Sequence, residues 1–391
     1  MNRNRNQDKA HGDEFMLHLS RWRLTSRQSW LKLGFLAFLL MMLSVSFSPV
    51  AWAADRVSRL PAGNAITDGK ALLRYALPID NKDIRNVQTS LEDITTQLRA
   101  NRRWGAISKD ASKAASILTK NQTALLASIP ADRQSEAEAL LAVMQQEVTE
   151  LQAAAEAKDK EQIRQKQAQL LDHVGELEEA MVQEFPFEVP AEYSNLPQLK
   201  GRATVAVETN KGPLTVVVDG YSAPVTAGNF IDLVQRGFYN GLEFTRAEDS
   251  YVLQIGDPPG PEEGFIDPKT GKYRAVPLEV LVQGDDAPTY GITLEDAGRY
   301  KDLPVLPFSA FGALALARPG DDPNGGSSQF FFFLFEPELT PAGLNLLDGR
   351  YAIFGYVTEG KPILDELKAG DKIISAKVIQ GGENLVQPQA A

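Results

Sequence analysis

Residues 324–335 read NGGSSQFFFFLF and form the most informative stretch of the second half of the chain. The apolar run within it, residues 330–335, has the length of a strand and no alternation of polar and apolar side chains. Such a run is typical of a strand that is buried on both faces. An exposed run of this kind would favour aggregation, so we expect it to lie within a core.

The residues before this run also favour strands. Residues 203–209 alternate between apolar and polar side chains, a turn is indicated at 210–212, and residues 214–218 are apolar again except for Thr215. This is the pattern of a β-hairpin. Residues 227–236 indicate one short helix. Many strands and few helices together predict a closed antiparallel β-barrel.

Residues 67–184 have a different composition, rich in Ala, Gln, Glu, Lys and Leu and almost free of Gly and Pro. Apolar residues recur there at steps of three and four, the period of an amphipathic helix. We predict four long helices in an up-down bundle, preceded by a short helix at about residues 68–77. The clearest stripes are Ile84, Val87, Leu91, Ile94 and Leu98; Leu140, Leu141, Met144, Val148 and Leu151; and Ile163, Leu170, Val174, Leu177 and Met181.

The first 53 residues have the organisation of a secretory signal. A basic segment at 21–32 precedes an apolar run at 33–43, and residues 51–53 read AWA, a small-residue cleavage site. The alternative is an uncleaved anchor, but the apolar run is shorter than the ~20 residues that span a bilayer. We therefore expect an exported protein that is peripheral to a membrane at most.

A Pro-rich stretch separates the two halves and has the composition of a stiff connector. The predicted organisation is a signal at 1–53, a helical bundle at 54–184, a linker at 185–199 and a second domain at 200–391. The second domain contains a long proline-rich insertion at 257–311.

Composition excludes several classes of function. The 391 residues include no Cys, which excludes thiol nucleophiles, disulfides and iron–sulfur clusters. The net charge of −11 argues against binding to nucleic acid. Only His173 remains once the signal is removed, so neither Ser-His-Asp chemistry nor a His-based metal site is expected. We predict no metal and no cofactor, and a monomer.

Four segments of the second half carry a family pattern in a fixed order. They are residues 223–230 (APVTAGNF), 244–257 (FTRAEDSYVLQIGD), 312–331 (GALALA, then NGGSSQFF) and 346–355 (LLDGRYAIFG). These segments resemble the cyclophilin-type peptidyl-prolyl isomerases. The resemblance covers about residues 200–384 and implies an eight-stranded antiparallel β-barrel capped by two helices. With the helical bundle, the predicted fold is α+β and multidomain.

The whole layout is similar to the large two-domain cyclophilins of the thylakoid lumen in plants and cyanobacteria, which are associated with photosystem II assembly and maintenance. This similarity implies a thylakoid lumen or periplasmic location. It also implies proline-containing polypeptides as substrates, with photosynthetic membrane proteins among the partners.

The resemblance implies which residues act on the peptide bond before a proline. That bond rotates over a barrier of about 20 kcal/mol, set by amide resonance. A cation that donates a hydrogen bond to the prolyl nitrogen weakens this resonance and stabilises the twisted state. Arg246 is implied to be this donor. Gln254 is implied to bind the substrate backbone and orient Arg246.

The same resemblance implies the peptide-binding residues. They are Tyr251, Val252, Ala317, Arg318, Gln329, Phe331, Leu346, Leu347 and Tyr351. Several of them depart from the family pattern. Leu346 and Tyr351 stand where the family has Trp and His, Arg318 where it has Asn, and Tyr251 where it has Phe. Thr245 replaces the His before Arg246. A less aromatic rim should bind proline peptides more weakly, so activity is expected to be reduced.

Three interpretations of function remain open at this point. The first is a prolyl isomerase. The second is a cyclophilin-fold chaperone or assembly scaffold with little turnover, which binds partners through both bundle and barrel. In the third, the bundle docks on the barrel and inhibits it. The insertion at 257–311 follows Gln254 closely, so we expect it to lie on the rim of the proline site and limit access.

Overall fold

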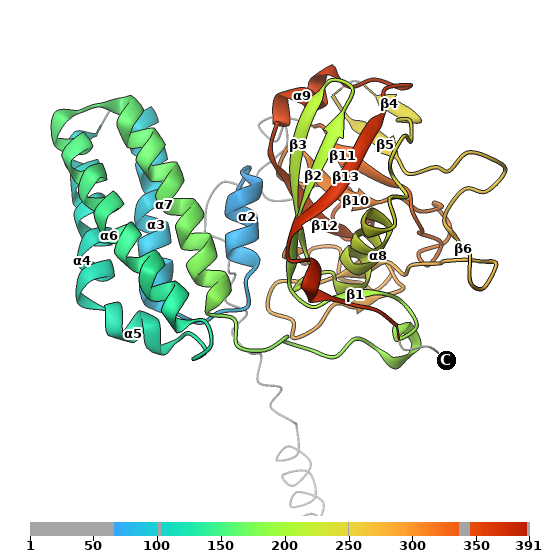
Figure 1. The fold of residues 1–391 in the computed structure, drawn as a ribbon, viewed down its shortest axis with the longest axis horizontal. Coiled ribbons are helices and arrows are strands. Elements are labelled where there is room, and N and C mark those ends of the chain that lie inside the picture. Colours follow the sequence, from blue (N-terminus) through green and yellow to red (C-terminus); the bar gives the residue numbers. More distant parts are fainter. Residues whose placement is uncertain (1–65, 101–102, 249, 336–344, 389–391) are drawn as a thin grey trace, which may run out of the picture. The chain divides into compact units, whose positions relative to one another are not determined.

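The computed structural model describes residues 66–100, 103–248, 250–335 and 345–388. The predicted signal at 1–53 and the start of the predicted bundle lie outside the described residues. Along the chain, a helical region precedes a region of strands (Figure 1). Within the described residues, no helix has both the length and the apolar character that crossing a bilayer requires.

The N-terminal region is helical, as predicted. Each of the long helices α3 and α6 packs against both α4 and α7. The three stripes identified in the sequence contribute to one core, with Leu140 only partly buried. The short helix α5 was not predicted. The helices are α2 (Gly69–Ala76), α3 (Lys82–Arg99), α4 (Trp104–Lys120), α5 (Gln122–Ala127), α6 (Gln134–Ala157) and α7 (Lys160–Ala180).

The C-terminal region is built on an antiparallel sheet of eight strands, in the order β13-β2-β3-β12-β10-β11-β5-β4. The predicted hairpin is confirmed, with Thr209 opposite Gly212. The strands are β2 (Arg202–Thr209), β3 (Gly212–Asp219), β4 (Arg246–Glu248), β5 (Val252–Ile255), β10 (Ala313–Leu316), β11 (Phe330–Phe333), β12 (Ile353–Glu359) and β13 (Ile373–Gln380). Helices α8 (Pro224–Gln235) and α9 (Lys361–Glu366) pack against this sheet.

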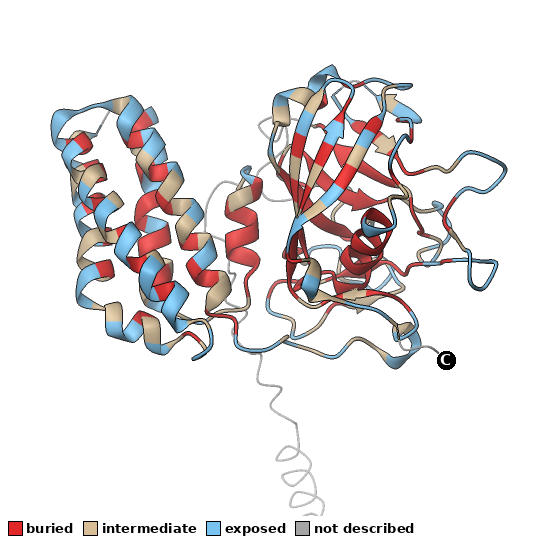
Figure 2. Cartoon of the chain, viewed as in Figure 1, coloured by how far each residue is buried: buried red, intermediate tan, exposed pale blue. Residues whose placement is uncertain are grey.

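The phenylalanine run forms β11 and is buried on both faces, as its sequence predicts (Figure 2). On one face, Phe330 and Phe332 join the core that includes α8. On the other face, Phe331 and Phe333 join a second apolar cluster, which we call the outer cluster. Its buried members are Leu72, Leu73, Ala76, Val252, Val305, Leu306, Phe308, Ala310, Ala313, Ala315, Phe331, Phe333, Ile353 and Tyr356.

The two ends of the sheet order, β4 and β13, approach each other through the segment before β4. The N–H of Gly241 donates to the carbonyl of Ile373 at 2.7 Å, and the N–H of Phe244 donates to that of Asp371 at 2.8 Å. The structure thus establishes an eight-stranded antiparallel sheet. A closed barrel with two capping helices stays a prediction, as do the domain boundaries.

The insertion has its own small sheets and apolar cluster. Val276, Leu278 and Val280 are buried there together with Leu196 of the linker. Its last part contributes Val305, Leu306, Phe308 and Ala310 to the outer cluster. The short strand pairs are β6 (Ile266–Asp267) with β7 (Lys272–Tyr273), β8 (Glu279–Val280) with β9 (Thr289–Tyr290) and, outside the insertion, β1 (Gln198–Leu199) with β14 (Leu385–Val386).

Candidate functional site

Strand register places the predicted catalytic and pocket residues on one face of the sheet. Arg246 of β4 pairs with Gln254 of β5, and Gln254 pairs with Phe331 of β11. Glu248 of β4 pairs with Val252. Directly opposed residues share a face, and so do residues two apart on one strand. Arg246, Glu248, Val252, Gln254 and Phe331 therefore face the side of the sheet that carries the outer cluster.

Arg246 is paired with a carboxylate of its own strand. Its Nε donates to Oε1 of Glu248 at 2.7 Å, and its Nη2 donates to the same oxygen. The two side chains are 54% and 46% exposed. An ion pair in such contact with water contributes about 0–1 kcal/mol, so a ligand can displace either member at little cost.

Gln254 belongs to a row of amides that crosses from β5 to β11. Its Nε2 donates to Oε1 of Gln329 at 2.7 Å. The Nε2 of Gln329 donates to the carbonyl of Glu263 at 2.7 Å and to Oδ1 of Asp257 at 3.3 Å. Burial and the charge of Glu263 raise the pKa of Asp257. The structure thus brings Gln254 and Gln329 together, while the orientation of Arg246 by Gln254 stays a prediction.

The apolar part of the site is covered by the insertion. Val252 and Phe331 are buried. The ring of Phe308, from the insertion, stacks on that of Phe331 with 6.1 Å between centroids and 5° between planes. Tyr251 is 38% exposed, and its ring lies edge-on to Phe333 at 6.0 Å. The centre of the predicted proline pocket is therefore in contact with the chain's own Phe308.

The opposite edge of the site is formed by Tyr351 and Arg318. The ring of Tyr351 lies edge-on to Phe331 at 5.4 Å, and the guanidinium of Arg318 lies 5.1 Å from the centre of the Tyr351 ring. Arg318 also donates from Nη2 to the carbonyl of Arg350 at 2.7 Å. Ala317 is fixed by its N–H, which donates to the carbonyl of Gln329 at 2.9 Å.

The two predicted leucines have different surroundings. Leu347 packs against the outer cluster. Leu346, which stands at the family's Trp position, is 89% exposed and is not a member of that cluster. The structure therefore brings Leu347 to the other predicted pocket residues and leaves Leu346 in solvent.

Asp348 is a site component that was not predicted from the sequence. Its Oδ1 accepts from the N–H of Phe308 at 2.8 Å, and its Oδ2 accepts from the N–H of Asn345 at 3.0 Å. Burial outweighs these hydrogen bonds and raises the pKa of Asp348 to about 6. This carboxyl ties Phe308 to the turn beside the pocket. The dipeptide Asp-Gly at this position is typical of a turn and does not by itself indicate a site residue.

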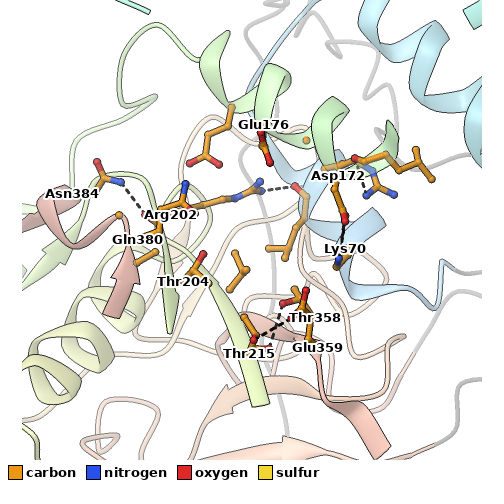
Figure 3. Close-up of a pocket in the computed structure, with 18 of the residues that line it drawn as sticks. Lys70, Asp172, Glu176, Arg202, Thr204, Thr215, Thr358, Glu359, Gln380 and Asn384 are labelled. Carbon is orange, nitrogen blue, oxygen red and sulfur yellow. Dashed lines mark hydrogen bonds and ion pairs between the residues drawn. The ribbon is translucent and has the colours of Figure 1, made fainter. Parts of the chain in front are cut away.

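A polar cleft of about 370 Å³ lies between helices α2 and α7 and strands β2, β3, β12 and β13 (Figure 3). Lys70 and Asp172 form an ion pair of 3.0 Å at one side. Arg202, at the other side, donates from Nε to Asp219 at 2.7 Å. None of the predicted site residues lines this cleft. Within the described part of the chain, no group of three or more His, Cys, Asp or Glu residues could hold a metal ion.

Comparison with protein families divides the chain into two matched regions. Residues 68–182 match the PsbQ-like domain of CYP38-like peptidyl-prolyl cis-trans isomerases. Residues 204–382 match the cyclophilin-type peptidyl-prolyl cis-trans isomerases.

Individual relatives span both regions. A Synechocystis protein named as a thylakoid lumen peptidyl-prolyl cis-trans isomerase is 58% identical over 91% of this chain and 95% of its own length. The chloroplastic isomerase CYP38 of Arabidopsis thaliana is 46% identical over 85% of this chain and 78% of its own. The chloroplastic isomerase CYP37 of the same plant is 32% identical over 86% and 74%. The chain therefore belongs to the cyclophilin-type peptidyl-prolyl cis-trans isomerases, and it carries the PsbQ-like domain in front of its cyclophilin domain.

Proposed function

We propose that this isomerase acts on proline-containing polypeptides with Arg246 as its catalytic cation and Gln254 as a substrate-binding amide. The observation that carries the proposal is the register, which places Arg246 beside Gln254 and Gln254 beside Phe331 on one sheet face. The chemistry requires a cation next to an apolar surface for the proline ring, and this face offers both.

The proposed mechanism needs no covalent step. The proline ring rests on Phe331 and Val252, and the polypeptide backbone is held by Gln254. Arg246 leaves Glu248 and donates to the prolyl nitrogen, which favours the pyramidal nitrogen of the twisted amide. Because this hydrogen bond strengthens as the bond rotates, it lowers the barrier rather than only tightening ground-state binding.

The remaining binding residues complete the proposed site. Tyr251 and Leu347 border the apolar surface, and Ala317 with Gln329 forms an edge along which an extended peptide lies. Arg318 and Tyr351 close the far side. Leu346 contributes only when the substrate extends over it, because its side chain is exposed.

The location and clients are proposed from the relatives. The name of the Synechocystis protein refers to the thylakoid lumen, and that of the Arabidopsis protein CYP38 refers to the chloroplast. We propose that this chain is exported to a thylakoid lumen or periplasm. There it would assist the folding or assembly of membrane-associated proteins of the photosystem II type, as a monomer peripheral to the membrane. For the fold, we propose that the eight-stranded sheet closes into a barrel capped by two helices.

A second candidate function is favoured by Phe308. Its ring stacks on Phe331, so a proline ring must displace it or bind beside it. A cyclophilin domain with an occupied apolar surface suits a chaperone or assembly scaffold of low turnover, which binds partners through the bundle and the cyclophilin domain together. The same contact supports the expectation that the insertion limits access to the site.

The test is Arg246→Ala in the full mature chain, with cis-to-trans isomerisation of a proline tetrapeptide as the measurement. Loss of one such electrostatic contact costs about 100-fold or more in rate. Arg164→Ala is the matched control, because Arg164 lies on α7 with 53% of its side chain exposed and pairs with Glu161. An unchanged rate in Arg246→Ala would contradict the assigned role. No turnover in any of the chains would favour the scaffold.

A further inference from the structure

We propose that Glu248 is a specificity-determining residue of this site and selects substrates that carry a Lys or Arg beside the proline. This inference rests on the proposed function, because it assigns the substrate class of the same site. A basic substrate side chain takes over the carboxylate of Glu248, and Arg246 is thereby released to the prolyl nitrogen.

The position of Glu248 follows from strand geometry. It lies two residues after Arg246 on β4, so both side chains project from the same face. In the register it is opposite Val252, a buried residue of the outer cluster. A carboxylate therefore stands next to the proposed catalytic cation and next to the apolar surface for the proline ring.

The contacts of Arg246 explain why this carboxylate matters for turnover. Both Nε and Nη2 of the guanidinium donate to Oε1 of Glu248. A guanidinium held in this way has fewer N–H groups free to bind a substrate. The negative charge of Glu248 also offsets part of its positive charge. A neutral substrate must compete with Glu248 for Arg246. A cationic substrate instead offers Glu248 a replacement partner.

The neighbouring charges favour the same substrates. At the end of the amide row that starts at Gln254, Gln329 donates to the carboxylate of Asp257 and to the backbone carbonyl of Glu263. The charge of Glu263 lies close enough to Asp257 to raise its pKa. The cation across the site, Arg318, is engaged by backbone carbonyls and by the Tyr351 ring. Glu248, Asp257 and Glu263 thus contribute three carboxylates to this part of the site, against the two guanidinium groups of Arg246 and Arg318. A substrate with positive charge is attracted there, and one with negative charge is repelled.

The experiment compares three tetrapeptides that differ only in the residue before proline: Lys, Gln or Glu. We expect the mature wild-type chain to isomerise the Lys peptide about 3- to 5-fold faster than the Gln peptide, and the Glu peptide more slowly still, at low salt. Added salt should reduce the difference, because the pair is exposed. In Glu248→Gln most of the preference should disappear, with only the small part due to Asp257 and Glu263 left, and the Gln peptide should be turned over faster than by the wild type.

Two further variants separate this role from a structural one. Glu248→Asp keeps the charge and should keep the order of preference. Glu243→Gln is the matched control, because Glu243 is an exposed carboxylate that pairs with Lys372 at 3.0 Å. It should leave both rate and preference unchanged. A preference that persists undiminished in Glu248→Gln, or that is absent from the wild type, would overturn the inference.

The outcomes also separate the inference from the function on which it rests. If Arg246→Ala isomerises all three peptides at the wild-type rate, the proposed site is wrong. If Arg246→Ala is impaired but Glu248→Gln behaves as the wild type, only the inference fails. If turnover is too slow to measure, binding of the three peptides is titrated by NMR. Tighter binding of the Lys peptide, lost in Glu248→Gln, supports the inference, and equal binding overturns it.

Discussion

Phe308 is the residue that most changes the proposed proline pocket. Its ring stacks on Phe331, and its N–H is held by the half-buried carboxyl of Asp348. A side chain from the insertion is therefore fixed against the surface on which a proline ring would rest. Aromatic stacking of this kind contributes about 0.5–1.5 kcal/mol beyond burial, so displacement of Phe308 weakens peptide binding.

Replacement of Phe308 by Ala should increase isomerase activity while it lowers stability. The vacated surface of Phe331 becomes available to the proline ring, so we expect kcat/KM to rise several-fold. Loss of a buried Phe costs about 3–5 kcal/mol in the free energy of unfolding. Phe265→Ala is the control, because Phe265 is buried in the core on the other face of the sheet. It should lose stability without a gain in activity, and a gain in Phe265→Ala would contradict the explanation.

The sequence predicted some residues of the site and could not predict others. Gln254 and Phe331 were found because they belong to short family segments, and strand register then brings the segments together. Phe308 and Asp348 meet across 40 residues, through packing that no local pattern encodes. The spacing of Arg246 and Glu248 on one strand predicts that their side chains share a face. It does not predict that the two side chains form an ion pair.

Among the secondary-structure elements, α8 shows how the insertion is attached to the sheet. The N-cap residue of α8, Ala223, provides no side-chain hydrogen bond. Glu279 of β8 takes that role from outside, since its carboxylate accepts from the N–H of Thr226 at 2.9 Å and of Val225 at 3.3 Å. The first N–H groups of a helix need such acceptors and favour negative charge. The insertion thus completes a helix of the cyclophilin domain.

The burial of Glu279 predicts how stability depends on pH. Burial raises its pKa from 4.5 to about 7 in the folded chain. Between these two pH values the carboxyl of Glu279 keeps its proton in the folded state and has lost it in the unfolded state. The contribution of this group is greatest below pH 4.5 and is lost as pH rises through about 7. We expect the free energy of unfolding to fall by at most about 3 kcal/mol over this range.

The measurement is urea unfolding at several pH values between 5 and 8. This range covers most of the interval between the ordinary pKa of Glu279, 4.5, and its pKa of about 7 in the folded chain. Glu279→Gln should show a weaker pH dependence than the wild type. Part of the dependence should remain, because burial also raises the pKa of Glu178 to about 7. The same slope in both chains would show that Glu279 does not titrate as described.

The sequence predicted the long elements and the two short helices at about residues 68–77 and 227–236, which the structure has as α2 and α8, but it did not predict α5 or the shortest strands. Helix α3 and the hairpin of β2 and β3 follow from repeated apolar positions at the helical and strand periods. The two-residue strands β6 to β9 are too short to show a period, so the insertion could be predicted only as a long proline-rich segment. The structure of the insertion depends on its packing against the outer cluster, to which Phe308 belongs.

At the scale of the whole described chain, helix α2 and the residue that follows it contribute to two apolar clusters. Leu72 and Leu73 are buried in the outer cluster with Phe331, and Leu77, just after α2, is buried with Val182 and Tyr221. Gly69 lies against Tyr356, where a Cβ would come within 2.7 Å of the Tyr356 Cβ. The helix nearest to the described N-terminus is thus packed on the same cluster as the proposed proline pocket.

A buried ion pair fixes this arrangement. Arg202 at the start of β2 donates to Asp219 at 2.7 Å and also to the carbonyl of Leu73 in α2. Ser222 donates to the second oxygen of Asp219 at 2.6 Å. Arg202 and Asp219 are both buried, so neither charge has water to replace a lost partner. Removing one partner of such a pair is far more destabilising than removing both.

Arg202→Met should therefore lower the free energy of unfolding by about 3–5 kcal/mol, measured by urea unfolding. Arg236→Met is the matched control, because Arg236 is partly exposed and its partner Asp232 keeps a second ion pair with Arg274. It should cost about 1 kcal/mol or less. Equal losses in the two variants would contradict the special role of Arg202.

The double variant Arg202→Met with Asp219→Asn identifies the origin of the loss. If the single variant is destabilised mainly by an unpaired buried charge, neutralising Asp219 restores much of the stability, because an amide is cheaper to bury than an isolated carboxylate. The part that is not restored measures what Arg202 contributes to its other partners, the Leu73 carbonyl of α2 and the charge of Glu179 on α7. Because these partners belong to α2 and α7, a large remainder would mean that β2 and the helices stabilise each other through this single guanidinium. No recovery in the double variant would instead assign the whole loss to the contacts with these helices.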